Sequence, residues 1–369
     1  MTPCPACLRR TELIGLLSIR ISAELAGRRR AQPILALADR DLIDAVGGSL
    51  RQAARRLVRE FDPHAALERI AAAGLHAVCR HEPSYPPRIL DLDDPPALLH
   101  ATAPPGRLAE LCGGPAAAVV GTRRASAYGL EVAAALGRGL AAAGVTVVSG
   151  LALGIDAAVH RGALEAGGPT VAVLGCGADV AYPRTNRSLY ERIRAHGAAV
   201  AELPPGQRPA RWTFPARNRI MAGIAGVTVV VEAAERSGSL ITAGFAQDLG
   251  RDVCAVPGRV TSRMAAGANQ LLLDGAHPVR GAADVLDLIF GAGGWDGART
   301  LAGHEAVEKG LDGTLERVLC AVESGDSVDQ AARRERMSAS DLRAALGRLE
   351  LMGLVRRDGL GAYERVAGR

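Results

Sequence analysis

Short runs of consecutive apolar residues alternate with longer amphipathic segments between about residue 75 and residue 290. The runs have the length of β-strands, and the segments between them repeat apolar residues at helical spacing. Strands that are apolar on both faces are typical of a parallel sheet covered by helices on both sides. We therefore expect a doubly wound α/β domain over residues 75–290, with strands at Ala116 to Val120, Val145 to Ser149, Thr170 to Leu174, Ala198 to Ala201, Val227 to Val231 and Asp252 to Val256.

The residues before this domain follow a helical pattern. Apolar spacing predicts short helices within residues 1–74, the last of which begins at Asp62-Pro63 and ends at Gly74. The Gly47-Gly48 turn between two of them suggests a SAM-like or helix-hairpin-helix unit. We expect a separate helical N-terminal domain.

The residues after the α/β domain fall into two segments with different sequence patterns. Residues 291–312 are rich in glycine and irregular, which indicates a linker. Residues 313–369 predict three helices and a hairpin, which is the pattern of a winged helix-turn-helix domain. The expected helices are Thr314 to Val322, Ser327 to Arg336 and Ser340 to Met352, and the hairpin turns at Asp358-Gly359.

Composition narrows the class of protein only a little. Apolar residues make up 48% of the 369 residues, and the net charge is +5 with a pI of about 9.0. Lys309 is the only lysine, so the abundance of arginine reflects compositional bias, and the placement of arginines says more than their number. The apolar runs are too short for a transmembrane helix, and no signal-peptide pattern precedes them. We expect a cytoplasmic protein with no membrane partner.

Cys4 and Cys7 form a C-x-x-C pair near the N-terminus, among seven cysteines in all. Scattered cysteines in an odd number fit a reducing compartment. A structural zinc site needs four ligands, and no second pair follows at the spacing of a zinc finger. We expect no metal site here and no cofactor elsewhere.

Turns of small residues follow several of the predicted strands and precede helices. Free N–H groups and the helix dipole favour an anion at such positions, and the carboxyl ends of parallel strands share one edge of the sheet. A phosphate-binding rim is expected there. Neither the dinucleotide fingerprint nor the P-loop pattern is present. Asp156 and His160 share one helix face, and a helix-capping aspartate and a packed histidine are preferred over a metal or acid/base pair.

The segment from Arg211 to Arg219 holds three arginines, an asparagine and two aromatic residues. No acidic residue lies between Glu202 and Glu232, so we expect this charge to be unneutralised. Guanidinium groups pair with phosphates and exposed rings stack on bases, which suits a nucleic-acid strand. Pro215 is expected to hold Phe214 extended at the rim of a basic loop. The alternative is a solvated loop whose aromatic rings fill the core.

These motifs together resemble the DprA/Smf family of DNA-processing proteins of natural transformation. The resemblance rests on GTRRAS, SGLALGIDAAVH, AYPRTN, FPARNR, SGSLITA and AVPG, in that order. It implies an extended Rossmann-like fold, binding of single-stranded DNA without sequence preference, homodimerisation and loading of RecA, with no catalytic activity. Single-strand-binding protein is a further expected partner. Ala268 departs from the family, which more often has threonine there.

The resemblance and the residue patterns select the same candidate site. The motif positions carried over from the family are Arg123 and the arginines and phenylalanine of the basic segment. With the small-residue turns, the DNA-binding candidates are Arg123, Arg124, Ser126, Ser149, Gly150, Arg211, Phe214, Arg217, Asn218, Arg219, Ser237, Gly238 and Ser239.

A second interpretation is an enzyme. The lysine-decarboxylase-like nucleotide hydrolases share a Rossmann-like core and cleave nucleoside monophosphates. Their P-G-G-x-G-T-x-x-E loop corresponds here to the segment from Ser237 to Ala243, which lacks the glutamate. Without that general acid/base, hydrolysis is disfavoured, and we expect no enzymatic activity.

Overall fold

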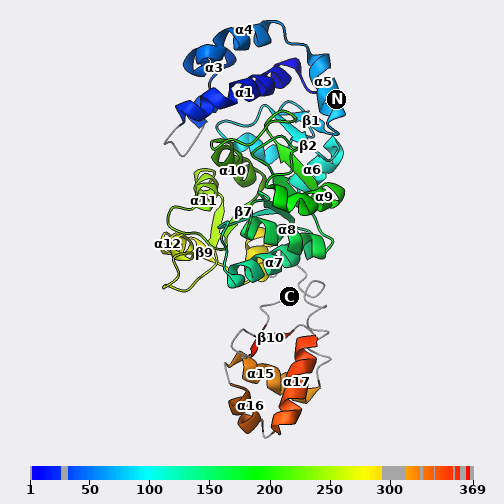
Figure 1. Ribbon diagram of the computed structural model, residues 1–369, viewed down its shortest axis with the longest axis vertical. Coiled ribbons are helices and arrows are strands. Elements are labelled where there is room, and N and C mark those ends of the chain that lie inside the picture. Colours follow the sequence, from blue (N-terminus) through cyan, green and yellow to red (C-terminus); the bar gives the residue numbers. More distant parts are fainter. Residues whose placement is uncertain are drawn as a thin grey trace. The chain divides into compact units, whose positions relative to one another are not determined.

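The computed structural model describes residues 2–25, 32–292, 312–324, 327–335, 337–351, 354–357 and 363–365. The chain divides into two compact units, Met1–Trp295 and Asp296–Arg369 (Figure 1). The helices before residue 75 therefore belong to the same unit as the α/β sheet.

A nine-stranded sheet forms the centre of the first unit, in the order β1-β2-β6-β5-β4-β3-β7-β8-β9. All neighbouring pairs from β6 to β9 are parallel, whereas β2 is antiparallel to both of its neighbours. The chain builds the sheet outward from β3, first through β4, β5 and β6 and then through β7, β8 and β9 on the other side. The strands are β1 (His76–Cys79), β2 (Leu98–Ala101), β3 (Ala116–Val120), β4 (Thr146–Ser149), β5 (Thr170–Val173), β6 (Ala198–Ala201), β7 (Val227–Val230), β8 (Asp252–Ala255) and β9 (His277–Pro278).

This sheet confirms the predicted fold class, and the six predicted strands are β3 to β8. The sequence did not predict β1, β2 or β9. His76 and His100 interrupt the apolar runs of β1 and β2, and β9 has only two residues.

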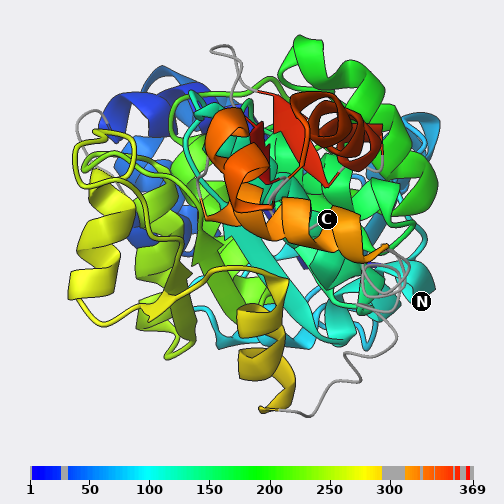
Figure 2. The same ribbon diagram turned by 90° about the horizontal axis from the view of Figure 1, so that it is seen from below.

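Helices flank the sheet on both faces (Figure 2). Alternate residues of β3 point to opposite faces, so Ala117 and Val119 meet one layer and Ala118 and Val120 the other. The first layer comprises α7 (Ala127–Ala142), α8 (Ile155–Glu165), α9 (Arg187–His196), which follows η3 (Arg184–Asn186), and α13 (Ala282–Phe290). The second comprises η2 (Pro87–Asp91), α6 (Pro105–Gly113), α10 (Thr213–Ile224), α11 (Ser239–Asp248) and α12 (Ala266–Leu273).

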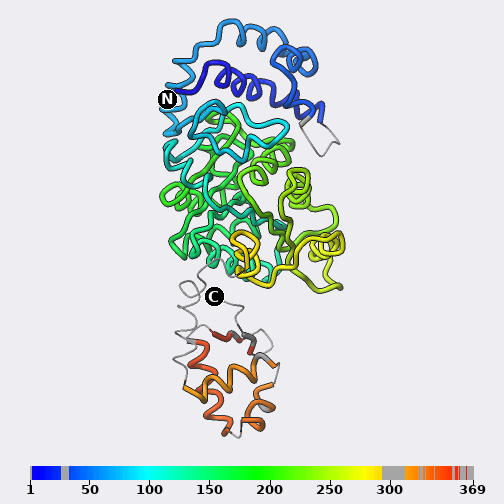
Figure 3. Tube along the Cα trace, turned by 180° about the vertical axis from the view of Figure 1, so that it is seen from behind, coloured from blue at the N-terminus to red at the C-terminus, as the bar shows by residue number. Residues whose placement is uncertain are grey.

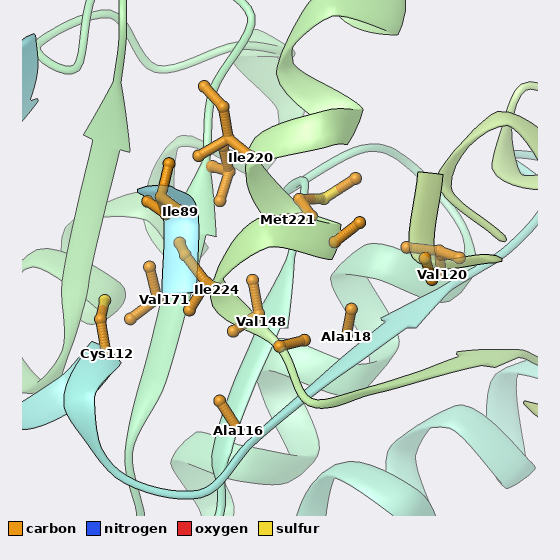
Figure 4. Close-up of a cluster of buried hydrophobic side chains, with 14 of the residues drawn as sticks. Ile89, Cys112, Ala116, Ala118, Val120, Val148, Val171, Ile220, Met221 and Ile224 are labelled. Atoms are coloured by element: carbon orange, nitrogen blue, oxygen red, sulfur yellow. The ribbon is translucent and has the colours of Figure 1, made fainter. Parts of the chain in front are cut away.

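Helix α10 is buried on nearly every side. Ile220, Met221 and Ile224 pack on the sheet beside Val148 and Val171 (Figure 4). The prediction of a basic loop was therefore wrong for most of this segment, which is helical from Thr213 onward. The prediction that Pro215 holds Phe214 in an extended conformation was wrong too. Both residues lie in the first turn of α10, where the backbone N–H groups have no partner within the helix, so proline removes no hydrogen bond.

The N-terminal helices pack around a core of their own. Trp212 lies in that core, and its Nε1–H donates to the carbonyl oxygen of Ser18 at 3.0 Å. Figure 3 shows these blue and light-blue helices at one end of the first unit. They are α1 (Pro5–Glu24), α2 (Gln32–Leu35), α3 (Asp39–Val46), η1 (Gly48–Leu50), α4 (Arg51–Arg59) and α5 (Pro63–Ala72).

Two details of this region were predicted from sequence. Asp62 caps α5 by accepting from the N–H groups of His64 and Ala65, and Gly74 follows the helix with a φ of +66°. Helix α1, with 20 residues, is longer than the short helices expected.

The second unit has its own apolar core, in which Leu315, Val318, Leu342 and Leu349 are buried. Among its described residues, three helices precede an antiparallel pair of strands, the order that a winged helix requires, and that assignment stays a prediction. The Asp358-Gly359 turn and most of the predicted linker lie outside the described residues. The elements are α15 (Gly313–Glu323), α16 (Val328–Arg334), α17 (Ala339–Leu351), β10 (Val355–Arg357) and β11 (Tyr363–Arg365).

Across the described residues, no helix has both the length and the apolarity needed to cross a membrane.

We predict that a chain ending near Phe290 folds without the second unit, because the two units have separate cores. Calorimetry of the full chain should resolve two transitions, and the shortened chain should keep the transition of the α/β unit at an unchanged temperature. A single transition that moves to lower temperature on shortening would contradict this separation.

Candidate nucleic-acid interface

A large cavity lies where the order of the sheet reverses. Strands β3 and β7 are neighbours in the sheet. After β3 the chain continues to β4 on one side of this pair, and after β7 it continues to β8 on the other side. Ligands of open α/β sheets bind outside the carboxyl ends of the strands at such a switch point. A cavity of about 430 Å³ occupies this position, within the size range of ligand pockets. Its walls are the turn after β3 (Gly121, Thr122, Arg123, Arg124), the first turns of α10 (Phe214, Pro215, Arg217, Asn218) and the start of α11 (Ser237, Gly238, Ser239), with side chains from neighbouring elements.

A second cavity of about 90 Å³ adjoins the first. Arg123, Phe214 and Arg217 line both cavities and therefore form the wall between them. The smaller cavity also contacts Gly150 and Tyr182. The two hollows form one basic groove divided by an aromatic ring.

Arg123 lies over the ring of Phe214, with the guanidinium carbon 5.0 Å from the ring centroid. Such a cation–π pair holds the exposed guanidinium of Arg123 against a half-buried ring. The ring of Tyr182 lies 5.6 Å from that of Phe214, and Tyr182 is 38% exposed. Sequence reasoning did not assign Tyr182 to the site, although its motif AYPRTN was recognised. Its position after β5, at the same edge of the sheet, is the signal that would have found it.

Arg217 is largely buried within the wall between the two cavities. Its guanidinium donates to the carbonyl oxygen of Val173 and lies 3.6 Å from a carboxylate oxygen of Asp156. Its Nε–H donates to Asn218 Oδ1 at 3.1 Å. A Cβ atom at Gly150 would occupy the space of the guanidinium, so any larger residue there would displace the Arg217 side chain.

Asp156 holds the turn before α8, since its carboxylate accepts from the N–H groups of Gly150 at 3.1 Å and Ala152 at 3.4 Å. Burial raises the pKa of this carboxyl group, and Arg217 opposes the shift. His160 packs in the core with Nδ1 2.7 Å from the hydroxyl of Thr170, and burial lowers its pKa to about 3. The packed histidine is therefore confirmed, whereas the helix-capping aspartate was wrong, because Asp156 bonds the loop before α8 and Gly154 is the N-cap of the helix.

The helix N-termini at the carboxyl edge of the sheet differ in whether a carboxylate already occupies the place of a phosphate. Glu232 accepts from both the N–H and the hydroxyl of Ser126, at 2.9 and 2.6 Å, so a carboxylate already occupies the start of α7. Ser126 in turn caps the helix at Gly129 N–H. Asp156 fills the same role at α8. The first turn of α11 holds no acidic residue and turns Ser237 and Ser239 toward the cavity, so this N-terminus is the better anion site.

Arg219 lies away from the groove, 1% exposed, between two carboxylates. Its Nε–H donates to Asp94 at 2.9 Å and its Nη2–H to Glu202 at 2.8 Å. Burial disfavours the charged guanidinium, but the two carboxylates outweigh that effect and raise the pKa of Arg219. The expectation that nothing neutralises this segment was wrong, because the acidic partners come from distant parts of the chain.

The candidates therefore divide into two groups. The groove brings together Arg123, Arg124, Gly150, Phe214, Arg217, Asn218, Ser237, Gly238 and Ser239. Arg211 is exposed outside it, and Ser149 is buried with its hydroxyl donating to the carbonyl oxygen of Val119. Ser126 and Arg219 also line neither cavity. For the candidates of both groups, contact with DNA stays a prediction.

Residues 76–290, more than half of the chain, match the family described as DNA recombination-mediator protein A. The chain belongs to the DprA/Smf family. This match confirms the resemblance drawn from the motifs. The putative DNA processing protein DprA of Mycobacterium tuberculosis is 44% identical over 174 residues, which cover 47% of this chain and 45% of that relative. The chain thus spans about half the length of this relative.

Two solved structures of this family share the fold. DNA processing protein A (DprA) from Streptococcus pneumoniae matches with a TM-score of 0.62 and 31% identity, over 78% of this chain and 99% of that one. DNA processing protein A from Helicobacter pylori matches with a TM-score of 0.52 and 27% identity, over 58% of this chain and 94% of that one. The structure of the H. pylori protein is described for its single-stranded DNA binding mode.

We predict that Arg219→Met lowers the free energy of unfolding by about 3–5 kcal/mol, because it leaves two buried carboxylates without their cation. Urea denaturation measures the change. Arg211→Met, an exposed arginine of the same segment, should leave the urea midpoint nearly unchanged. Equal midpoints for the two variants would show that the buried ion pair does not stabilise the fold.

Proposed function

We propose that this chain binds single-stranded DNA without sequence preference through the basic groove at the β3–β7 switch point. The observation that carries the proposal is the wall between the two cavities, where Arg123 lies over Phe214. A strand crossing this wall places phosphates near Arg123 and Arg124 and a base against the ring. The start of α11 provides backbone N–H groups and serine hydroxyls for a further phosphate.

The chemistry of the groove favours tolerance of sequence. Every base has a π-face that an aromatic ring accepts, and phosphates are the same along the strand. Asn218 carries an amide of the kind that reads base edges, but its Nδ2–H donates to the carbonyl oxygen of Gly238 at 3.1 Å. Duplex DNA keeps its bases stacked and cannot offer a face to Phe214, so single strands are the preferred ligand.

Membership of a recombination-mediator family supports a proposal about partners. We propose that the chain acts in the cytoplasm as a homodimer and assists the loading of RecA onto the bound strand. Single-strand-binding protein, which covers the same strands, is the further partner proposed.

We further propose that the chain is not an enzyme. Among the described residues that line the larger cavity, Asp156 is the only acidic one, and its carboxylate is held by backbone N–H groups and Arg217. A nucleoside-monophosphate hydrolase needs a general acid/base that is free to exchange a proton. Release of ribose phosphate from AMP by the purified chain, lost in Asp156→Asn, would favour the hydrolase instead.

We predict that Arg123→Ala weakens binding to oligonucleotides of different sequence to the same degree. Loss of one phosphate contact should also make the slope of log affinity against log salt concentration shallower by about 0.7. Fluorescence anisotropy across a salt series measures both effects. Arg107→Ala removes an exposed arginine of α6 outside the groove and should change neither. Unchanged affinity in Arg123→Ala would place the DNA on another surface.

We predict that Phe214→Ala costs about 1–3 kcal/mol of strand affinity, the usual value of a base stacked on an aromatic ring. Phe214 is only partly buried, so the melting temperature should fall little. Phe214→Leu keeps apolar volume but no π-face and should lose nearly as much affinity. A large drop in melting temperature with normal affinity of the folded fraction would identify the ring as core.

A further inference from the structure

Four potential metal ligands meet where the N-terminal helix joins the edge of the sheet. Cys4 precedes the first turn of α1 and Cys7 lies within it, while Cys79 ends β1 and His81 follows in the next turn. The ligand atoms of these four side chains all lie within 4.8 Å of one another. Among the described residues, this is the one such convergence of three or more cysteine, histidine or acidic groups.

The spacing of the ligand atoms fits a single tetrahedral ion. With zinc–sulfur bonds of about 2.3 Å and zinc–nitrogen bonds of about 2.0 Å, neighbouring ligand atoms lie about 3.5–3.8 Å apart. His81 Nδ1 is 3.4 Å from Cys4 Sγ and 3.5 Å from Cys7 Sγ. An iron–sulfur cluster would hold its cysteines farther apart, on different metal atoms. A disulfide between Cys4 and Cys7 would leave Cys79 and His81 without a role.

Local hydrogen bonds pre-form the two halves of the site. At the helix start, the N–H groups of Cys7 and Leu8 donate to the carbonyl oxygen of Cys4, at 3.1 and 3.2 Å. After β1, the N–H of Glu82 donates to the carbonyl oxygen of Cys79 at 2.9 Å, and Glu82 Oε1 accepts from Cys79 N–H at 3.0 Å. This closed turn fixes His81 beside Cys79.

We propose that Cys4, Cys7, Cys79 and His81 bind one Zn²⁺ ion that fastens helix α1 to strand β1. Three thiolates and one imidazole are ligands that zinc prefers, and a complete set of four protein ligands characterises a structural rather than a catalytic site. The sequence prediction of no metal site relied on a missing second pair of ligands. The structure supplies that pair from the C-x-H segment of residues 79–81, more than seventy residues away. His81 is exposed and Cys4 half-buried, so an ion has a path to the site.

The test is the metal content of the full chain, purified under reducing conditions without a polyhistidine tag. Mass spectrometry of the metal should give about one zinc per chain, as a four-ligand site holds a single ion. Cys4→Ser and His81→Gln remove ligands near the surface and should each abolish most of the zinc, as should Cys79→Ser. The matched control is Cys320→Ser, an exposed cysteine of the second unit, which should keep the full content.

Two further measurements decide the matter if a variant fails to fold. The unaltered chain, stripped of metal and loaded with Co²⁺, should show the intense visible bands of tetrahedral cobalt–thiolate coordination. A chelator should lower its melting temperature, and added Zn²⁺ should restore it. Weak octahedral cobalt bands, zinc content unaffected by the ligand variants, or a Cys4–Cys7 disulfide in a chain that takes up no zinc would each overturn the proposal.

Discussion

The position of α10 depends on one buried charge. Arg219 lies in the interior of the first unit and is held by Asp94, from the loop before β2, and by Glu202, after β6. A guanidinium without these carboxylates would be too costly to bury, and the carboxylates would be equally costly without it. The three groups therefore occur together or not at all. Their geometry fixes the rotation of α10 about its axis, and with it the direction of every other side chain on that helix.

The rest of the basic motif follows from that rotation. With Arg219 directed into the core, Arg217 lies in the wall between the two cavities beside Asp156, and Phe214 lines the groove one turn earlier. The arginines of the two motifs GTRRAS and FPARNR thus serve different purposes. Those with buried acidic partners hold the fold, whereas Arg123, exposed over Phe214, stays available to an external anion. Intramolecular carboxylates likewise occupy the starts of α7 and α8, whereas the first turn of α11 holds no acidic residue.

The sequence predicts the centre of this fold better than its edges, for a physical reason. Strands β3 to β8 are buried on both faces, so polar residues mark where they end. The turns that follow β3 and β7 contain Gly121 and Ser237, which line the groove, so their small residues predict its position. Helix α10 escaped prediction because Arg217 and Arg219 look like surface residues until their partners are known. Those partners, Asp156 and Asp94, are distant in sequence, and no local pattern reveals them. The same holds for the pairing of the N-terminal cysteines with the segment after β1.

The N-terminal helices bear on the groove although none of the described residues before Val120 lines its larger cavity. Trp212, immediately before α10, is anchored in their core through Ser18. On the far side of the same helix, a cavity of about 280 Å³ is bordered by Cys7, His81 and the Arg219 ion pair. Helix α10 is thus fixed at its start by the N-terminal core and along its length by a charge cluster that adjoins the cysteine–histidine group. The N-terminal core and the cysteine–histidine group thus both adjoin the one helix that carries Phe214 to the groove.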